Sequence, residues 1–441
     1  MNKNISTKTL QDLEFTTVLQ HVAEFCISGL GKEKVFNTQP IPNKKELFKE
    51  LHLVNEYLSS FESENRVPNH GFDNITESVK RLVIENSFIE TEAFLKIATT
   101  SLTVNELIKF FKKFKVQFST FYEISQEIEF TTFVNDEIKN IIDLSGEVKN
   151  NASPVLKQIR KDINNIRGKI GASFTSALTK AISSGYLDDI KETVVDNQRV
   201  LAVQAMYRRK VSGSLLGASK SGNIVYIAPQ ATLAYSREYQ NLIYEEKQEV
   251  VKILRNLSEV IRPSLSLIND YLKFLIYIDT IGAKAKYALE INAILPKISR
   301  EKKVLFKNAY HPILWKKNKE QNLKTISQTL ELNNQQQIIV ISGPNAGGKS
   351  ITLKTIGLLQ LMLQSGILIP VDERSQTYIF DTILTDIGDN QSIENQLSTY
   401  SYRLKNMRYF LRKCNENTLF LIDEFGTGSD PELGGALAEI F

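Results

Sequence analysis

Cysteine is scarce in this sequence of 441 residues, which contains only Cys26 and Cys414. The two are far apart and lack the spacing of metal ligands. The four histidines form no ligand cluster either; they are His21, His52, His70 and His311. The cysteine usage suits a reducing cytosol and argues against a disulfide scaffold. We therefore expect a cytoplasmic protein.

Long apolar runs are also missing. No uninterrupted apolar run is long enough to span a bilayer, and Met1–Lys8 has no apolar core for a signal peptide. We therefore expect no membrane partner. Charged residues make up 24% and hydrophobic residues 42%, an ordinary globular composition, and the length allows two or more domains. The net charge of +4 permits nucleic-acid binding but does not argue for it.

The most informative stretch is Gly343–Ser350, which fits the G-x-x-x-x-G-K-[ST] pattern of phosphate-binding loops. The β-branched run Gln337–Ser342 before it predicts a buried strand, and the periodic run Ile351–Gln364 after it predicts a helix. A strand, a glycine loop and a helix in this order surround an anion with backbone N–H groups and a helix N-terminus. The stretch therefore predicts a nucleotide site.

Each residue type in this loop has a role. The glycines let the backbone curl close to phosphates, Lys349 supplies a charge for the β- and γ-phosphates, and Ser350 offers a hydroxyl to Mg²⁺. The residues predicted to bind the nucleotide are Gly343, Pro344, Asn345, Ala346, Gly347, Gly348, Lys349 and Ser350.

A second stretch, Thr418–Glu424, is an apolar run that ends in two carboxylates and begins about 70 residues after the loop. This is the Walker B pattern, in which Asp423 would hold Mg²⁺ and Glu424 would polarise the attacking water. The alternative is a solvated acidic turn. Together the two stretches predict an ATPase with ATP and Mg²⁺ as cofactors, and Lys349 and Glu424 as catalytic residues.

Two further blocks make the pattern specific. Asp386-Ile-Gly-Asp-Asn-Gln-Ser precedes Leu-Ser398-Thr399-Tyr, and Asp423-Glu-Phe-Gly-Thr-Gly-Ser-Asp-Pro follows. With the loop, these blocks resemble the MutS family of DNA-repair ATPases, and no Leu-Ser-Gly-Gly-Gln signature of transporter ATPases is present. The resemblance implies a homodimer through the ATPase domain, in which Ser398 and Thr399 reach the γ-phosphate on the partner subunit. Both residues also suit a helix N-cap.

The opening of the chain, Thr9-Leu-Gln-Asp-Leu-Glu-Phe, resembles the MutS-two subfamily, which begins directly with a helical core. Only about 340 residues precede the phosphate loop, too few for the mismatch-reading and connector domains of the mismatch-repair branch. We therefore expect no mismatch reader.

The periodicity indicates three regions. Residues 1–147 form a helical core, residues 148–297 form lever helices with a β insert near 198–230, and residues 298–441 form the ATPase domain. The expected fold is multidomain: a mainly α-helical core and lever, a small β clamp, and a P-loop (ABC-type) α/β domain. The insert resembles the short clamp of the MutS-two subfamily.

Basic residues occur at the predicted turns of this insert. Arg208, Arg209, Lys210 and Lys220 would contact DNA phosphates without reading sequence. The alternative is a basic hairpin tip that touches nothing.

The resemblance implies an ATP-dependent clamp on branched or recombination-intermediate DNA. Some members are linked to stalled ribosomes, so a ribosome or rRNA partner stays open. A non-enzymatic DNA-binding fragment and a mismatch-repair ATPase are further alternatives. In the family the chain continues past the position of Phe441 into a switch histidine, a dimerisation segment and often an Smr nuclease domain. We therefore expect a truncated gene or a fragment, without the family's nuclease activity.

Overall fold

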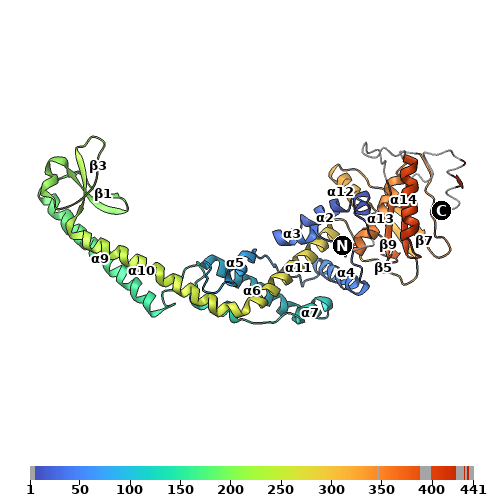
Figure 1. Ribbon diagram of the computed structural model, residues 1–441, viewed down its shortest axis with the longest axis horizontal. Coiled ribbons are helices and arrows are strands. Elements are labelled where there is room, and N and C mark those ends of the chain that lie inside the picture. Colours follow the sequence, from blue (N-terminus) through green and yellow to red (C-terminus); the bar gives the residue numbers. More distant parts are fainter. Residues whose placement is uncertain (1–4, 345–346, 388–398, 424–431, 433–434, 437–441) are drawn as a thin grey trace. The chain divides into compact units, whose positions relative to one another are not determined.

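The computed structural model describes residues 5–344, 347–387, 399–423, 432 and 435–436. The chain divides into two compact units, and we describe each by itself (Figure 1). The larger unit comprises Met1–Asn74, Thr100–Thr131 and Asn269–Phe441. The smaller unit comprises Ile75–Thr99 and Thr132–Ile268.

Helices are the main secondary structure of the larger unit. They are α1 (Thr7–Asp12), α2 (Phe15–Ala23), α3 (Gly29–Phe36), α4 (Lys44–Ser59), the 3-10 turn η1 (Ser60–Glu62), α7 (Ser119–Gln126), α12 (Pro312–Glu320), α13 (Lys349–Gln364), α14 (Thr399–Lys413), and parts of α6 (Thr91–Lys113) and α11 (Leu265–Glu290). Side-chain caps set several starts: Ser6 accepts a hydrogen bond from the Thr9 N–H at the start of α1, and Asn43 caps α4.

The larger unit also contains two sheets. A four-stranded sheet has the order β5-β8-β6-β7, and its strands are β5 (Lys297–Ile298), β6 (Val304–Ala309), β7 (Gln328–Leu332) and β8 (Gln376–Thr377). A parallel pair joins β9 (Thr382–Asp386) to β10 (Thr418–Ile422), with Ile422 opposite Asp386. Helix α13 packs against β10, and every residue of α13 from Thr355 to Gln364 is buried. This helix is the core element that leads away from the glycine loop.

The helix predicted over Ile351–Gln364 is confirmed as α13, but the strand predicted over Gln337–Ser342 is wrong. That segment has no strand structure, and the side chains of Ile338 and Val340 are 84% and 85% exposed. An apolar β-branched run has strand propensity, but a strand also needs a partner to complete its hydrogen-bond ladder. Among the described residues, β10 pairs only with β9.

The smaller unit is built around two long helices. Its elements are α5 (Thr76–Leu82), part of α6, α8 (Phe133–Ile141), α9 (Pro154–Ser183), β1 (Leu187–Val195), β2 (Gln198–Gln204), the 3-10 turn η2 (Ala205–Lys210), β3 (Gly213–Ala218), β4 (Ile224–Pro229), α10 (Gln230–Ile261), the 3-10 turn η3 (Arg262–Ser264) and the start of α11. Helices α9 and α10 run side by side, and the sheet lies at one end of the pair (Figure 1).

The four strands of this sheet are antiparallel in the order β1-β2-β4-β3. An apolar cluster joins the sheet to α9, and its buried members are Phe174, Ala181, Leu201, Val203, Val225 and Ile227. Between the long helices, Arg160 of α9 forms an ion pair of 2.6 Å with Glu246 of α10. The apolar cluster thus fixes the sheet on α9, and the ion pair joins α9 to α10.

The sheet begins at Leu187, so the start predicted near residue 198 is wrong. Strand β1 lacks apolar–polar alternation because Asp188 and Asp189 follow Leu187, and its pairing with β2 provides the order that its own pattern does not show. Within the part of the chain that the structure describes, no helix is long and apolar enough to cross a lipid bilayer.

Candidate functional site

The glycine loop turns tightly before α13. Gly343 has a φ of 146° and Gly348 a φ of 81°, backbone conformations that favour glycine, and Gly348 is the N-cap of α13. The Gly347 N–H donates a hydrogen bond of 2.8 Å to the Pro344 carbonyl. The predicted residues Asn345 and Ala346 lie outside the described residues. The described part of the loop therefore leads directly into a helix N-terminus.

Two residues predicted to bind Mg²⁺ meet in the structure although they are far apart in sequence. Ser350, in the first turn of α13, donates a hydrogen bond of 2.6 Å from its Oγ to Oδ2 of Asp423, which directly follows β10. A hydroxyl and a carboxylate are hard oxygen donors of the kind that Mg²⁺ accepts in nucleotide sites. The donor set therefore fits a magnesium ion.

The side chain of Lys349 folds back onto the backbone of the glycine loop. Lys349 is the first residue of α13, and its Nζ donates a hydrogen bond of 2.5 Å to the Gly343 carbonyl. The ammonium is thus on the loop side of the helix N-terminus, where a positive charge and the N–H groups of the first turn together attract an anion. This placement agrees with the phosphate-binding role that the sequence predicts.

The structure describes little or nothing of three other predicted residues. Glu424 and Ser398 lie outside the described residues, and Thr399 is described only as the first residue of α14. Their predicted roles at the γ-phosphate therefore stay predictions.

A polar network beside the Ser350–Asp423 pair was not predicted. The Asp386 carboxylate, at the end of β9, accepts hydrogen bonds at Oδ1 from Lys8 Nζ at 3.2 Å and Asn406 Nδ2 at 3.0 Å. Nearby, Thr385 Oγ1 donates to Asp12 Oδ2 at 2.7 Å, and burial raises the pKa of the Asp12 carboxyl. Asp386 opens a block that the sequence analysis singled out. Nothing in the sequence near Lys8 indicates this contact.

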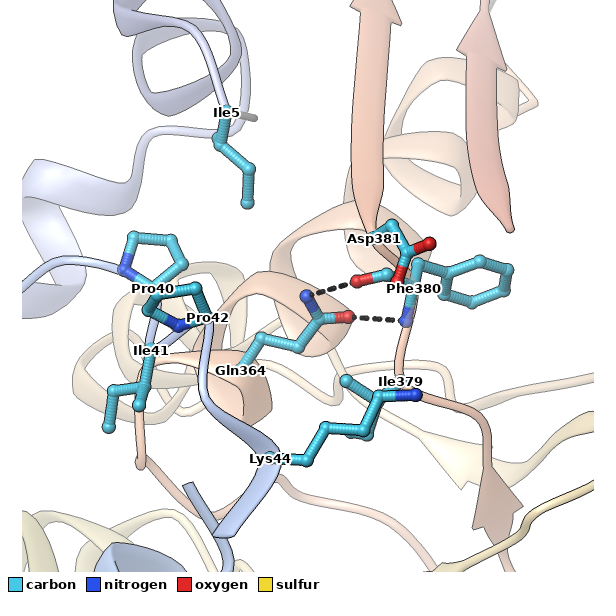
Figure 2. A pocket seen from close by; sticks show the side chains of 9 residues that line it. All are labelled: Ile5, Pro40, Ile41, Pro42, Lys44, Gln364, Ile379, Phe380 and Asp381. Atoms are coloured by element: carbon cyan, nitrogen blue, oxygen red, sulfur yellow. Dashed lines mark hydrogen bonds between the residues drawn. The ribbon is translucent and has the colours of Figure 1, made fainter. Parts of the chain in front are cut away.

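The far end of α13 is held by several unpredicted contacts. Figure 2 shows Gln364 bonded twice to Phe380: its Nε2 donates to the carbonyl at 3.0 Å, and its Oε1 accepts from the N–H at 3.0 Å. The Gln364 carbonyl also accepts a hydrogen bond of 2.8 Å from the Ile41 N–H, beside a small cavity of about 60 Å³. Next to it, Lys284 Nζ forms a buried ion pair of 2.7 Å with Glu50 and donates to the Ser365 carbonyl. Helix α13 is thus fixed at both ends.

The basic residues predicted to bind DNA lie on connections between strands of the smaller unit. Arg208, Arg209 and Lys210 form the last part of η2, which joins β2 to β3, and Lys220 lies in the turn between β3 and β4. All four side chains are exposed. Met206, also on η2, is 75% exposed. The structure thus places these cations at the surface and shows no contact that orients them toward a ligand.

Known proteins are similar to this chain, both over the glycine loop region and over nearly its whole length. The family model described as MutS domain V matches residues 339–440, the stretch that contains the loop, α13, β9 and β10. The endonuclease MutS2 of Lactobacillus helveticus (strain DPC 4571) is 33% identical over 437 residues, which cover 98% of this chain and 55% of that protein. The chain belongs to the MutS family, and its similarity is to the MutS2 branch.

Other relatives match in the same way. The endonuclease MutS2 of Finegoldia magna (strain ATCC 29328 / DSM 20472 / WAL 2508) is 33% identical over 98% of this chain and 54% of its own length. The endonuclease MutS2 of Bacillus velezensis (strain DSM 23117 / BGSC 10A6 / LMG 26770 / FZB42) is 32% identical over the same shares. This MutS-family chain thus spans about half the length of the curated relatives it matches.

Proposed function

We propose that this chain is an ATP-dependent DNA-binding protein that hydrolyses ATP with Mg²⁺ through a P-loop ATPase domain. The observation that carries the proposal is the 2.6 Å hydrogen bond between Ser350 and Asp423, which joins the end of the glycine loop to the end of β10. Mg²⁺–nucleotide chemistry requires a hydroxyl from the glycine loop and a carboxylate from the following strand end, and this contact brings the two together.

In this proposal, separate groups of the chain bind the metal, bind the phosphates and orient the attacking water. Ser350 and Asp423 hold Mg²⁺, which when bound neutralises the charge of the phosphate oxygens. The loop N–H groups and Lys349 bind the β- and γ-phosphates. Glu424 orients the attacking water and accepts its proton. Ser398 and Thr399 of a second subunit complete the site in a homodimer, so that ATP binding closes the dimer.

We also propose that the sheet at the end of α9 and α10 contacts DNA. Arg208, Arg209, Lys210 and Lys220 are exposed on its connections, where long cationic side chains reach phosphates and read no sequence. Branched or recombination-intermediate DNA is the proposed ligand, because the resemblance to the MutS-two subfamily implies it.

A competition assay tests the proposed ligand. The chain is mixed with a labelled four-way DNA junction and one unlabelled competitor, which is the junction itself, plain duplex, mismatched duplex or collided ribosomes, with and without a non-hydrolysable ATP analogue. We expect the junction to compete best and the analogue to change its affinity. Preference for collided ribosomes would make the protein a ribosome-associated ATPase, and preference for the mismatch would make it a mismatch-repair ATPase. Lys349→Ala serves as the control, because it removes the analogue's effect.

A further inference from the structure

We propose that Lys8, acting through Asp386, is a positioning residue for the magnesium-binding carboxylate of Asp423. The inference rests on the proposed Mg²⁺–ATP site and assigns to it a residue of the first helix, far from the loop in sequence. The contacts that carry it run from α1 to β9, and from β9 to the residue that follows β10.

The first step is the link between the two strands. The Asp423 N–H donates a hydrogen bond of 2.9 Å to the Asp386 carbonyl, directly after the last ladder pair of β9 and β10. Asp423 in turn accepts the Ser350 hydroxyl. The backbone of Asp423 is thus fixed by Asp386 on one side, while its carboxylate faces the loop helix. A shift of Asp386 would move the carboxylate relative to Ser350.

The second step is what fixes Asp386. Asp386 is buried, with 6% of the residue exposed. A buried charge is stable only when it is paired and hydrogen-bonded. Lys8 supplies a positive charge at 3.2 Å from Oδ1, and Asn406 of α14 supplies an amide N–H at 3.0 Å from the same atom. Without the Lys8 charge, Asn406 is the side-chain partner that remains to the Asp386 carboxylate among the described residues, and it is neutral.

The third step is what holds Lys8 in place. Helix α1 lies along β9: Thr9 Oγ1 donates to the Ile383 carbonyl at 3.4 Å, and Thr385 Oγ1 donates to Asp12 at 2.7 Å. The Lys8 ammonium is also 4.0 Å from the Asp12 carboxylate. Because α1 is anchored to β9 at Thr9 and Asp12, shortly after Lys8, the ammonium reaches Asp386 from a fixed helix. Helix α1 therefore contacts the strand whose end positions the proposed metal-binding carboxylate of Asp423.

A structural role and a positioning role predict different results. If Lys8 only stabilises the fold, its loss weakens nucleotide binding equally with and without Mg²⁺. If Lys8 positions Asp423, metal-free nucleotide affinity, which depends on the loop and Lys349, stays unchanged and only the Mg²⁺ requirement rises. Loss of an outer-shell partner commonly weakens metal binding by about tenfold or more.

The experiment measures binding of a fluorescent ATP analogue in EDTA and across a Mg²⁺ titration. The variants are Lys8→Met, Lys8→Arg and the matched control Lys45→Met, which changes an exposed lysine at the start of α4. We expect Lys8→Met to raise the half-saturating Mg²⁺ concentration by about tenfold, with the EDTA affinity unchanged. Lys8→Arg should restore the wild-type value. A Lys8→Met titration that overlays Lys45→Met, or an equal loss in EDTA, would overturn the inference.

Two further variants separate this inference from the proposed function. Ser350→Ala should raise the Mg²⁺ requirement through the proposed ligand itself. If the wild type shows no Mg²⁺-dependent binding, the proposed function fails; if Ser350→Ala has its effect and Lys8→Met has none, only the inference fails. Should Lys8→Met not fold, Asn406→Ala removes the amide that the structure describes on the Asp386 carboxylate and is expected to raise the Mg²⁺ requirement, whereas an unchanged requirement would contradict the inference.

Discussion

The nucleotide region and the clamp region of this molecule are built on different principles. The nucleotide region, formed by α13, β9, β10 and the residues that contact them, gathers side chains from distant parts of the sequence through buried contacts. The clamp region, formed by β1–β4 with η2, has its cations on exposed connections. In the nucleotide region, the proposed function depends on positions that packing fixes. In the clamp region, the proposed function depends on exposed charge.

The comparison has a measurable consequence. Substitutions behind the nucleotide site should change stability, because the same contacts hold the fold and the site. Substitutions of the clamp cations should change nucleic-acid binding with little effect on stability. Four predictions test this difference, in order of decreasing size.

Breaking the buried ion pair at the end of α13 should have the largest effect. Lys284 is 2% exposed and pairs with Glu50, so Lys284→Ala leaves a buried carboxylate without its cation. The expected cost is about 3–5 kcal/mol, measured as lost amide-exchange protection in α13. The exposed pair Lys80–Glu77 of the smaller unit provides the control, and Lys80→Ala should cost less than about 1 kcal/mol. Equal losses in the two variants would contradict the comparison.

Acid should destabilise the nucleotide region through His311. Burial lowers the pKa of His311 from 6.5 to about 4. The folded protein therefore stays neutral at this residue while the unfolded chain takes up a proton. The contribution to stability is complete above pH 6.5 and is lost as the pH falls toward 4. The loss reaches at most about 3 kcal/mol.

The chain's single tryptophan reports on this effect. Trp315 lies on α12, and its N–H donates to the His311 carbonyl at 2.8 Å. Urea unfolding followed by Trp315 fluorescence should show a steeper loss between pH 6.5 and 4 in the wild type than in His311→Asn, which keeps a capping oxygen. Parallel curves would show that His311 does not couple protonation to folding.

The same substitution should have opposite signs in the two units. Gly357 lies inside α13, and a Cβ there would overlap Leu421 of β10 and Leu13, so Gly357→Ala should cost about 1–3 kcal/mol. Gly168 is exposed on α9 with open space around its Cα, so Gly168→Ala should stabilise α9 by up to about 1 kcal/mol. Local amide exchange measures both. A loss at Gly168 or a gain at Gly357 would contradict the packing described for that helix.

The clamp cations should have the smallest effect on stability. Replacing Arg208, Arg209 and Lys210 together by alanine changes exposed side chains only, and each such change is usually within about 0.5 kcal/mol. DNA binding should weaken instead. The slope of log affinity against log salt concentration should become shallower by up to about 3, one unit for each lost phosphate contact. An unchanged slope would place the DNA elsewhere.

The part of the site that could be predicted is the part with a local pattern. The loop and α13 follow from glycine spacing and helical periodicity, and the Ser350–Asp423 contact follows from two motifs whose chemistry requires a shared metal. The strand predicted over Gln337–Ser342 failed because strand propensity is local but strand pairing is not. The early start of the sheet at Leu187 was missed for the same reason.

The contacts behind the site could not be predicted at all. Lys8 and Asp386 are separated by 378 positions in the sequence, and no periodicity connects the two. Lys284 and Glu50 lie on helices whose apolar stripes are clear, yet the pairing of two charges within those stripes depends on how the helices pack. Sequence patterns name the groups that touch a ligand more readily than the groups that hold them.

The most direct test of the central claim is calorimetric titration of ATP into the wild type, Ser350→Ala and Lys349→Ala, each with Mg²⁺ and with EDTA. We expect the wild type to bind ATP more tightly with Mg²⁺ than with EDTA. Ser350→Ala should lose most of that metal-dependent gain, and Lys349→Ala should bind in neither condition. Unchanged ATP affinity in Lys349→Ala, or a full Mg²⁺ gain in Ser350→Ala, would contradict the assignment of the loop and its hydroxyl to nucleotide and metal.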